Sequence, residues 1–513
     1  MGANAASENR SERYWLAAAL VVSLAAAVLR IWPIRESLWI DELHTAWCAV
    51  GALDEVASRA AIGNQSPLYF WFQWLLVRVL GPSELALRLP SLIAGSLLPL
   101  AVFFVGRRWL NAPVGFLAAA LVGIDPLAIL YASEARPYAV VQVLAVVHFA
   151  LTAEILTNPA TALRVAWVVV GGLLFHLHYT AALLFPAELL FYGLMMVVQP
   201  RVVAYRWQSM ACDGAIVAVV CLPAIGALNA IFARRANWNA FVELVPYSTI
   251  VTWWPPALGA WYVAAEIVIP KRMGGGRLAP GVLLLCWLIV PTLLAWIFAQ
   301  SGVARLFYWR YLIACAPAAA LLAAGSVELA PWRWAKWGLG AILLFAALWS
   351  SDIVSHLYHE GRVIAARGED WRACIAWLNE ETQQTQFPIL VWSGLIEADA
   401  LRQPHDELFV EYCLFPVNSL YPLDVEPADL FPLPMKQPGR LDQVVEMLMV
   451  HRGGAWLIVR GNQQTGKSIA ESIVANLDKS AIQVGGGKWR IQNQKSFGKL
   501  QAIRLAAGLP DGR

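Results

Sequence analysis

Long apolar stretches separated by short polar and basic segments fill the first 350 residues of the chain. Because a bilayer span needs about 20 apolar residues, this pattern predicts about eleven transmembrane helices. No small-residue cleavage site follows the first stretch, so we expect a retained helix there and not a signal peptide. Residues 1–352 are therefore predicted to form an all-α polytopic membrane domain. The predicted spans begin near Tyr14, Arg88, Pro113, Tyr138, Leu163, Ala181, Ala211, Thr249, Leu278, Tyr311 and Ala335.

The pattern changes after Ser350, where polar residues alternate with short apolar runs and with Gly and Pro breaks. It predicts helices at 370–380 and 466–477, and strands at 388–392, 455–460 and 497–505. About 150 residues suffice for one small domain. We therefore predict that residues 353–513 form a small C-terminal α/β domain.

The segment Pro67–Leu80 is apolar but short, and it is rich in Trp, Tyr and Phe. Aromatic side chains favour the headgroup zone, so we interpret it as a helix lying in the interface. A short transmembrane helix fits its length equally well. With the interfacial interpretation and an inside N-terminus, basic pairs such as Arg107-Arg108 and Lys271-Arg272 fall in cytoplasmic loops, as the positive-inside rule requires. The chain is thus predicted to be multi-pass in the inner (cytoplasmic) membrane, with its C-terminal domain extracytoplasmic.

Composition supports a membrane protein, because only 14% of the residues are charged and 59% are hydrophobic. Soluble domains carry about 25% charged residues. A net charge of +3 gives no reason to expect nucleic acid as a partner, whereas membrane lipids are expected partners. The seven cysteines form no Cys-x-x-Cys pair, which argues against a zinc or redox site. Spacing alone does not decide whether Cys374 and Cys413 form a disulfide.

Two adjacent carboxylates, Asp41 and Glu42, follow the first predicted span. Such a pair is costly in lipid but tolerable where a helix reaches water. Partial desolvation at the membrane surface raises the pKa of a carboxylate, which suits Asp41 to act as a general base. The alternative is structural, since acidic residues are common at the start of a helix such as 43–50.

Further polar residues gather in the predicted outer loops. Glu134 and Arg136 share a loop too short to fold independently, and Arg305 and Arg310 follow in a later one. Outer arginines run against the inside bias, and a phosphate would explain them because guanidinium binds phosphate with two hydrogen bonds. The alternative is that they are solvated flanks or partners of nearby acids.

His176 and His178 are two residues apart and so about 200° apart on a helix, which prevents both from facing one metal. One of them with an outer carboxylate would still suit a divalent ion, although local hydrogen bonding is the commoner role. Asp125, His148 and Glu188 lie inside predicted spans. Such buried ionisable groups keep a transporter or flippase with an outer domain open as an alternative.

The stretch 461–468 (GNQQTGKS) fits the Walker A pattern, between a predicted strand and a predicted helix. Its predicted location is outside the cell, where nucleoside triphosphates are scarce. About 45 residues follow it, too few for the further βα units of a nucleotide-binding sheet. We therefore do not expect a working nucleotide site.

Several motifs together resemble the GT-C membrane glycosyltransferases, in particular the bacterial proteins similar to protein O-mannosyltransferases and to the lipid A aminoarabinose transferase. The resemblance covers about residues 14–322, with a weaker similarity at 370–372. The motifs are Asp41-Glu42 after the first span, Pro67-Leu68-Tyr69, Ser83-Glu84 leading to Arg88-Leu89-Pro90-Ser91, the run 131–138 (YASEARPY), His178-Tyr179 and Arg310-Tyr311-Leu312.

The resemblance implies an inverting sugar transfer from a polyprenyl-phosphate-linked donor to a protein, lipid or glycan acceptor. Asp41 matches the catalytic acid, Glu42 completes that pair, and Glu134 matches a second acidic residue. Relatives often carry His or Lys where Gln65-Ser66 stands, so a metal or phosphate contact at that position is in doubt. No cofactor is assigned, and a divalent metal stays open; a ligase or polymerase with a lipid-diphosphate donor is the alternative within this architecture. The substrate-binding candidates are Arg88, Arg136, Tyr138, His178, Tyr179, Arg305 and Arg310.

Overall fold

The computed structural model describes residues 2–239, 242–250, 278–402, 406–484 and 488–507. Its contacts divide the chain into two compact units. The first comprises Met1–Ile34, Asn64–Tyr69 and Arg88–Ala365, and the second Arg35–Gly63, Phe70–Leu87 and Ala366–Arg513. The second unit thus takes in most of the first predicted outer loop as well as the C-terminal segment, whereas the sequence suggested one boundary at 352/353.

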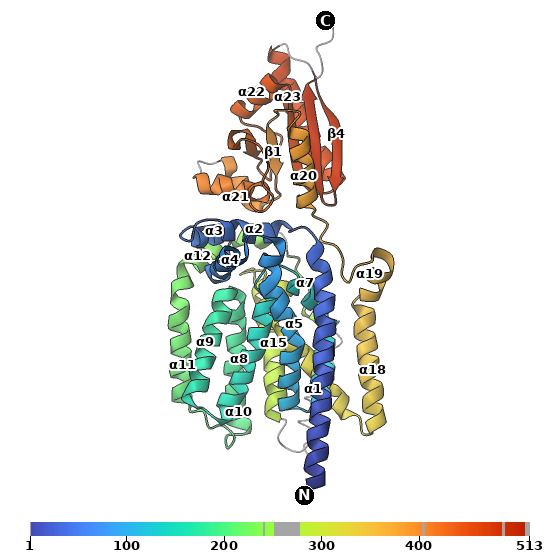
Figure 1. The fold of residues 1–513 in the computed structure, drawn as a ribbon. Coiled ribbons are helices and arrows are strands. Elements are labelled where there is room, and N and C mark those ends of the chain that lie inside the picture. Colours follow the sequence, from blue (N-terminus) through green and yellow to red (C-terminus); the bar gives the residue numbers. More distant parts are fainter. Residues whose placement is uncertain (1, 240–241, 251–277, 403–405, 485–487, 508–513) are drawn as a thin grey trace. The chain divides into compact units, whose positions relative to one another are not determined.

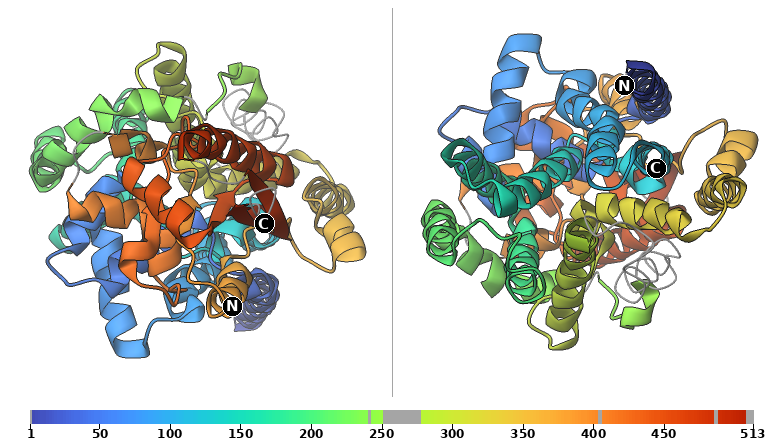
Figure 2. Two further views of the ribbon diagram at one scale, coloured as in Figure 1. Left: turned by 90° about the horizontal axis from the view of Figure 1, so that it is seen from above. Right: turned by 90° about the horizontal axis from the view of Figure 1, so that it is seen from below.

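The first unit is a bundle of apolar helices (Figures 1 and 2). Helix α6 packs against α1 and α17, α8 against α9, and α10 against α15. Helix α5 begins in the second unit. The α-helices of the first unit among the described residues are α1 (Gly2–Ile31), α5 (Glu84–Trp109), α6 (Ala112–Gly123), α7 (Pro126–Ala132), α8 (Tyr138–Thr157), α9 (Thr161–Leu177), α10 (Phe185–Val198), α11 (Trp207–Cys221), α12 (Ile225–Ala233), α13 (Arg235–Asn239), α15 (Leu278–Gln300), α16 (Trp309–Leu312), α17 (Ala316–Ser326), α18 (Arg333–Ser350) and α19 (Ile353–Glu360).

Within the described residues, seven helices are long and apolar enough to cross a membrane, or nine if two bent pairs each count as one span. Helix α9 is apolar but shorter, at 17 residues. These elements lie where the sequence predicts spans, and the polytopic helical fold is confirmed. The span predicted from Thr249 runs into 251–277, outside the described residues. Helix α4 (Pro67–Leu80) forms as a 14-residue helix, and its interfacial position stays a prediction.

One predicted span, from Pro113, is broken by a 65° bend between α6 and α7. Pro126 begins α7, and Asp125 caps it by accepting a hydrogen bond from the Ala128 backbone N–H at 2.7 Å. The buried guanidinium of Arg30 donates to the carbonyls of Val122 and Gly123 at the end of α6, at 3.2 and 3.0 Å. Asp125 and Arg30 therefore satisfy backbone groups that the break releases.

Helices α5 and α6 approach closely because two glycines face each other. A Cβ atom at Gly115 would lie 2.6 Å from the Phe103 carbonyl oxygen and 2.7 Å from the Arg107 backbone nitrogen, and one at Gly106 would lie 2.7 Å from Gly115. No side chain fits in this crossing. Small residues that let backbones approach are typical of helix contacts in membranes.

The second unit contains a five-stranded sheet of order β2-β1-β3-β5-β4. Strands β2, β1 and β3 are parallel, with Val391 opposite Ile458, and β5 runs antiparallel to β3 and β4. The strands are β1 (Ile389–Trp392), β2 (Leu430–Pro432), β3 (Gly454–Arg460), β4 (Trp489–Phe497) and β5 (Leu500–Ala507), and the helices are α2 (Ile40–Val50), α3 (Val56–Ile62), α20 (Trp371–Thr382), α21 (Glu407–Asn418), α22 (Gln443–Arg452) and α23 (Gln463–Val484).

The predicted α/β character of the C-terminal segment is confirmed, although β2, α21 and α22 were not predicted, and two further differences concern the last strands. The strand predicted at 497–505 is β5, which begins at Leu500, and its neighbour β4 was not predicted. Strand β4 lies at the sheet edge and exposes most of its polar residues, so it lacks the apolar signal of a buried strand. Cys374 and Cys413 are both buried free thiols, so no disulfide joins them.

Candidate active site

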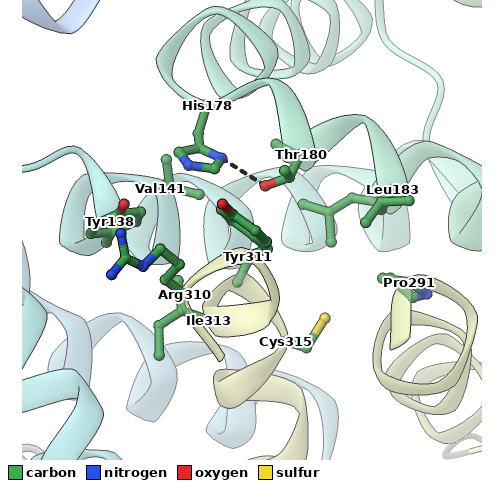
Figure 3. Close-up of a pocket in the computed structure, with 13 residues that line it drawn as sticks. Tyr138, Val141, His178, Thr180, Leu183, Pro291, Arg310, Tyr311, Ile313 and Cys315 are labelled. Atoms are coloured by element: carbon green, nitrogen blue, oxygen red, sulfur yellow. Dashed lines mark hydrogen bonds between the residues drawn. The ribbon is translucent and has the colours of Figure 1, made fainter. Parts of the chain in front are cut away.

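A pocket in the first unit collects several of the predicted site residues (Figure 3). It forms where α9 ends and the chain turns into the 3-10 segment Tyr179–Leu184, close to the start of α8 and to α16. His178 has an extended backbone at this turn, which ends α9. The lining residues are Tyr138, Val141, His178, Thr180, Ala181, Leu183, Leu184, Pro291, Arg310, Tyr311, Ile313, Ala314 and Cys315.

The polar side of this pocket is built around His178. Its Nδ1 atom is hydrogen-bonded to the Thr180 hydroxyl at 2.6 Å. Its ring centroid lies 5.4 Å from that of Tyr138 and 5.9 Å from that of Tyr311. Figure 3 shows these rings and Arg310 around the same space. The remaining walls are aliphatic, so the pocket joins a polar end to an apolar lining.

Two positive charges act on His178. Burial, together with the guanidinium groups of Arg136 and Arg310, lowers the pKa of His178 to about 3. The imidazole is therefore neutral near pH 7 and adds no third positive charge beside the two arginines. The charges of Glu134 and Arg310 also act on the Tyr131 hydroxyl. The structure thus brings Glu134, Arg136, Tyr138, His178 and Arg310 into one electrostatic neighbourhood.

The short loop that carries Glu134 and Arg136 is buried. Both residues are 3% exposed, and the Ser91 hydroxyl of α5 donates to the Arg136 carbonyl at 2.7 Å. Arg88, one turn earlier in α5, is fully buried and donates to the Ile34 carbonyl at 2.8 Å. The sequence similarity around 88–91 therefore corresponds to residues that hold neighbouring backbone in place.

Three other predicted residues lie outside this pocket. Tyr179 hydrogen-bonds Ser66, whose hydroxyl also donates to the His176 carbonyl. Arg305 donates to the Val242 carbonyl. The His176 ring bonds the Val220 carbonyl at 2.9 Å, so the two histidines serve different sites. Across the described part of the chain, no three His, Cys, Asp or Glu side chains converge as a metal site would require.

The sequence did not single out Thr180 or Cys315, which also line the pocket, and it named Tyr311 only as part of the 310–312 motif. Thr180 and Tyr311 adjoin the predicted His178-Tyr179 and Arg310 positions, and that adjacency is the signal that would have found them. Cys315 belongs to the apolar stretch that continues into α17, where nothing in the sequence separates it from packing residues.

The carboxylate pair belongs to the second unit, at the start of α2. Glu42 is fully buried, and its carboxylate accepts a hydrogen bond from the Trp39 backbone N–H at 3.3 Å. It thus caps the helix, as the structural alternative described. Asp41 is only partly buried. The pKa of Tyr412 is raised mainly by burial, and the charges of Glu397, Cys413 and Asp41 add to this effect in that order.

Glu369, a residue that the sequence did not single out, anchors the start of α2. Its carboxylate accepts hydrogen bonds from the Ile40 backbone N–H and the Trp371 indole N–H, both at 3.0 Å. Its other oxygen pairs with Arg460 at 2.7 Å. Glu369 is 7% exposed. The position of Asp41, the neighbour of Ile40, therefore depends on a carboxylate over three hundred residues later, next to the weak sequence similarity at 370–372.

The buried ionisable residues in the spans bond to one another. His148 and Glu188 are joined at 3.1 Å, and Glu188 also accepts a hydrogen bond from Thr152. The Trp167 indole donates to Thr152 at 2.9 Å and stacks on His148 with ring centroids 5.2 Å apart. This network ties α8, α9 and α10 together. The network therefore explains why His148 and Glu188 are buried in the spans without any need for a transport pathway, the reason for which the sequence left a transporter as an alternative.

Comparisons with known proteins agree with this architecture. Residues 64–226 match the family model described as dolichyl-phosphate-mannose-protein mannosyltransferase, a match that begins after Asp41 and Glu42. No curated protein matches the chain. Among solved structures, ArnT from Cupriavidus metallidurans in the apo state is similar over 98% of this chain and 100% of its own, with TM-score 0.54 and 14% identity.

Two further structures extend this likeness. The same ArnT bound to undecaprenyl phosphate matches over 97% of this chain and 98% of its own, again with TM-score 0.54 and 14% identity. The Archaeoglobus fulgidus oligosaccharyltransferase in complex with Zn and sulfate matches over 90% of this chain and 70% of its own, with TM-score 0.54 and 14% identity. The family match over residues 64–226 and the shared fold over nearly the whole chain confirm the resemblance inferred from the sequence: this is a multi-pass membrane protein with the fold of the GT-C glycosyltransferases.

Proposed function

We propose that this protein transfers a sugar from a polyprenyl-phosphate-linked donor to an acceptor on the extracytoplasmic side of the inner membrane. The observation that carries the proposal is the pocket at His178, which Arg310 and aliphatic side chains line and where the charge of Arg136 also acts on the imidazole. A phosphate with a lipid tail combines negative charge and apolar surface in the same way, and the pocket, whose enclosed space is about 10 Å³, must widen to admit it. The ArnT structure with undecaprenyl phosphate supports the same donor class.

In the proposed reaction the acceptor hydroxyl oxygen attacks the anomeric carbon from the side opposite the phosphate. The new carbon–oxygen bond forms as the bond to the phosphate oxygen breaks, which inverts the configuration. Asp41 takes the acceptor proton, and polyprenyl phosphate leaves with the bonding electron pair. Arg136 and Arg310 stabilise the negative charge that develops on the departing phosphate, so the leaving group needs no proton.

The other candidates take supporting parts in this proposal. Glu42 and Glu369 fix the first turn of α2, and thereby the position of Asp41. Arg88 holds the backbone at Ile34. Glu134, beside Tyr131 and Arg310, lies in the electrostatic neighbourhood of the phosphate site and orients its groups. These residues act through others, so their substitution should impair placement more than chemistry.

Replacement of Asp41 by Asn tests the base. We expect Asp41→Asn to reduce transfer by at least a hundredfold while binding of undecaprenyl phosphate is unchanged, because only the proton acceptor is lost. Asp54→Asn is the matched control, since Asp54 is an exposed acid in the same segment with no partner among the described residues, and it should retain full activity. Transfer by Asp41→Asn within tenfold of the native rate would contradict the base assignment.

The donor and the orientation need separate measurements. Purified protein supplied with an undecaprenyl-monophosphate sugar and an acceptor should form a product whose anomeric carbon is inverted, as judged by NMR of the anomeric proton. Turnover of lipid-diphosphate donors alone would favour the ligase or polymerase alternative. Labelling of an Asp54→Cys variant in intact cells with a membrane-impermeant maleimide should succeed. Labelling only after cells are lysed would place this segment inside and refute the proposed topology.

A further inference from the structure

The stretch that fits the Walker A pattern forms the beginning of α23 and not a phosphate-binding loop. Helix α23 begins at Gln463, so the residues from there to Ser468 are helical. The Asn462 side chain accepts hydrogen bonds from the Thr465 backbone N–H and hydroxyl at 2.8 and 2.9 Å, and the Gly466 N–H bonds the Asn462 carbonyl at 3.0 Å. Two of the backbone donors that would cradle phosphate in a true P-loop, those of Thr465 and Gly466, are therefore engaged within the chain.

The lysine of the pattern is also in the wrong place for phosphate. Lys467 is 65% exposed, lies 3.8 Å from the Glu471 carboxylate one turn later, and does not line the adjacent cleft. Thr465 and Ser468, close to it in the sequence, do line the cleft. The stretch thus contributes a wall to a different kind of site.

That site is an open cleft of about 510 Å³, within the roughly 300–1,000 Å³ range of small-ligand pockets. It lies where the three parallel strands end: Trp392 is the last residue of β1, Met435 follows β2, and Asn462 follows β3. The carboxyl ends of parallel strands are the usual place for ligands in open α/β sheets. The cleft is lined by Trp392, Met435, Pro438, Asn462, Gln464, Thr465, Ser468, Ile469 and Ser472.

One wall of the cleft is a row of neutral hydrogen-bonding side chains. Gln464, Ser468 and Ser472 are spaced by four residues and so share one face of α23. All three are exposed, and none of them bonds another side chain or backbone group within the described residues. Amide and hydroxyl groups both donate and accept, which suits a ligand that presents hydroxyl groups.

The rest of the lining is mostly apolar and carries an oriented indole. The Trp392 Nε1–H donates to the Met435 carbonyl at 3.3 Å, which orients the ring. Among the described residues that line the cleft, none is charged. A nucleotide or phosphate would find no cation here, whereas a sugar ring offers C–H groups to the aromatic and apolar wall and hydroxyl groups to the polar one.

We propose that this cleft binds a neutral saccharide, and that the saccharide belongs to the acceptor. The first statement stands on the cleft itself; the second rests on the proposed transferase function. It assigns to the second unit the task of holding a carbohydrate-bearing acceptor, with Gln464, Ser468 and Trp392 as the residues that recognise it.

Saturation-transfer NMR on the full chain in detergent tests the binding. The probes are N-acetylglucosamine and the methyl glycosides of glucose, galactose and mannose, with ATP and inorganic phosphate as contrasts. Ser468→Trp should fill the cleft and reduce the saccharide signal at least fivefold, whereas Lys467→Trp, which adds the same bulk beside the cleft, should leave it unchanged. ATP and phosphate should give no signal that Ser468→Trp removes.

The outcomes separate the cleft from the transferase proposal. The inference would be overturned by any of three results. No saccharide gives a signal, the saccharide signal is equal in Ser468→Trp and native protein, or ATP or phosphate gives a signal that Ser468→Trp removes. In a transfer assay, Ser468→Trp should raise KM for a saccharide-bearing acceptor at unchanged donor affinity. Saccharide binding without any sugar transfer by the native protein would instead count against the proposed function and leave the saccharide site in place.

Discussion

The anchor of α2 by Glu369 yields a quantitative prediction. In Glu369→Ala, the Ile40 and Trp371 N–H groups lose their acceptor in buried positions, at about 1–3 kcal/mol each. The ion pair with Arg460, whose side chain is 27% exposed, adds about 1 kcal/mol after screening by solvent. Allowing for relaxation, we expect the first turn of α2 to be destabilised by about 3–5 kcal/mol.

Hydrogen exchange measures this loss locally. A cost of this size raises the opening equilibrium of the turn roughly a hundredfold or more, so a peptide covering residues 38–50 should exchange correspondingly faster. Sugar transfer should fall in parallel, because Asp41 follows Ile40 directly. Peptides from the first unit, such as one covering α8, should keep their protection.

Glu380→Ala is the matched control, because Glu380 is an exposed acid on α20 with no partner within the part of the chain that the structure describes. It should change protection by less than about 0.5 kcal/mol. A double-mutant cycle with Arg460→Met isolates the ion pair. If Glu369→Ala left the exchange of residues 38–50 within threefold of native, the assignment of Glu369 as the anchor of Asp41 would be refuted.

Three further changes test the first unit. Arg310→Gln should weaken undecaprenyl-phosphate binding roughly ten- to hundredfold in a binding assay, because a charge-assisted contact contributes about 1.5–3 kcal/mol. Arg333→Gln, at an exposed position, should leave the affinity unchanged. Equal affinities of the two variants would show that Arg310 does not contact the donor. Because the pKa of His178 is lowered to about 3 in the folded protein, the unfolded chain binds this proton at a higher pH than the folded chain does. The contribution of His178 to stability should therefore be full above about pH 6.5 and should fall as the pH drops toward 3. His178→Gln should flatten this part of the plot of unfolding temperature against pH, and parallel plots for the two proteins would contradict the lowered pKa. Gly115→Ala should lower the free energy of unfolding by about 1–3 kcal/mol, because its methyl group would clash with α5. Gly193→Ala should leave this free energy unchanged or raise it, because the added methyl group meets open space. The same unfolding temperature for both variants would refute the close crossing of α5 and α6.

The positions of the apolar helices were the part most open to sequence reasoning. Span length is imposed by the bilayer, so the starts near Tyr138, Leu278 and Tyr311 could be found from apolar runs alone. The bend between α6 and α7 was less visible. The sequence offered Asp125 beside Pro126, but the partner that satisfies the broken end, Arg30, comes from another helix.

The Walker A stretch shows that a sequence motif binds phosphate only when its backbone adopts the loop conformation. The residues and the strand–helix context fit the pattern, yet the helix starts within the stretch and Asn462 takes the donors that a phosphate would need. Nothing in the spacing of glycines and lysine reveals where a helix begins. The same residues, seen in three dimensions, line a neutral cleft instead.

The site illustrates the same division between local and tertiary information. The sequence by itself determined that this is a multispan protein with a mixed α/β tail, and it named Asp41, Glu134, His178 and Arg310, because the bilayer and the outer loops constrain local composition. Only the tertiary structure decided that Glu42 caps a helix, that Arg136 and Arg310 act together on His178, and that Glu369 holds Ile40. The physical reason is that hydrogen bonds and charge interactions act over a few ångströms in space, and chain segments hundreds of residues apart supply their two ends.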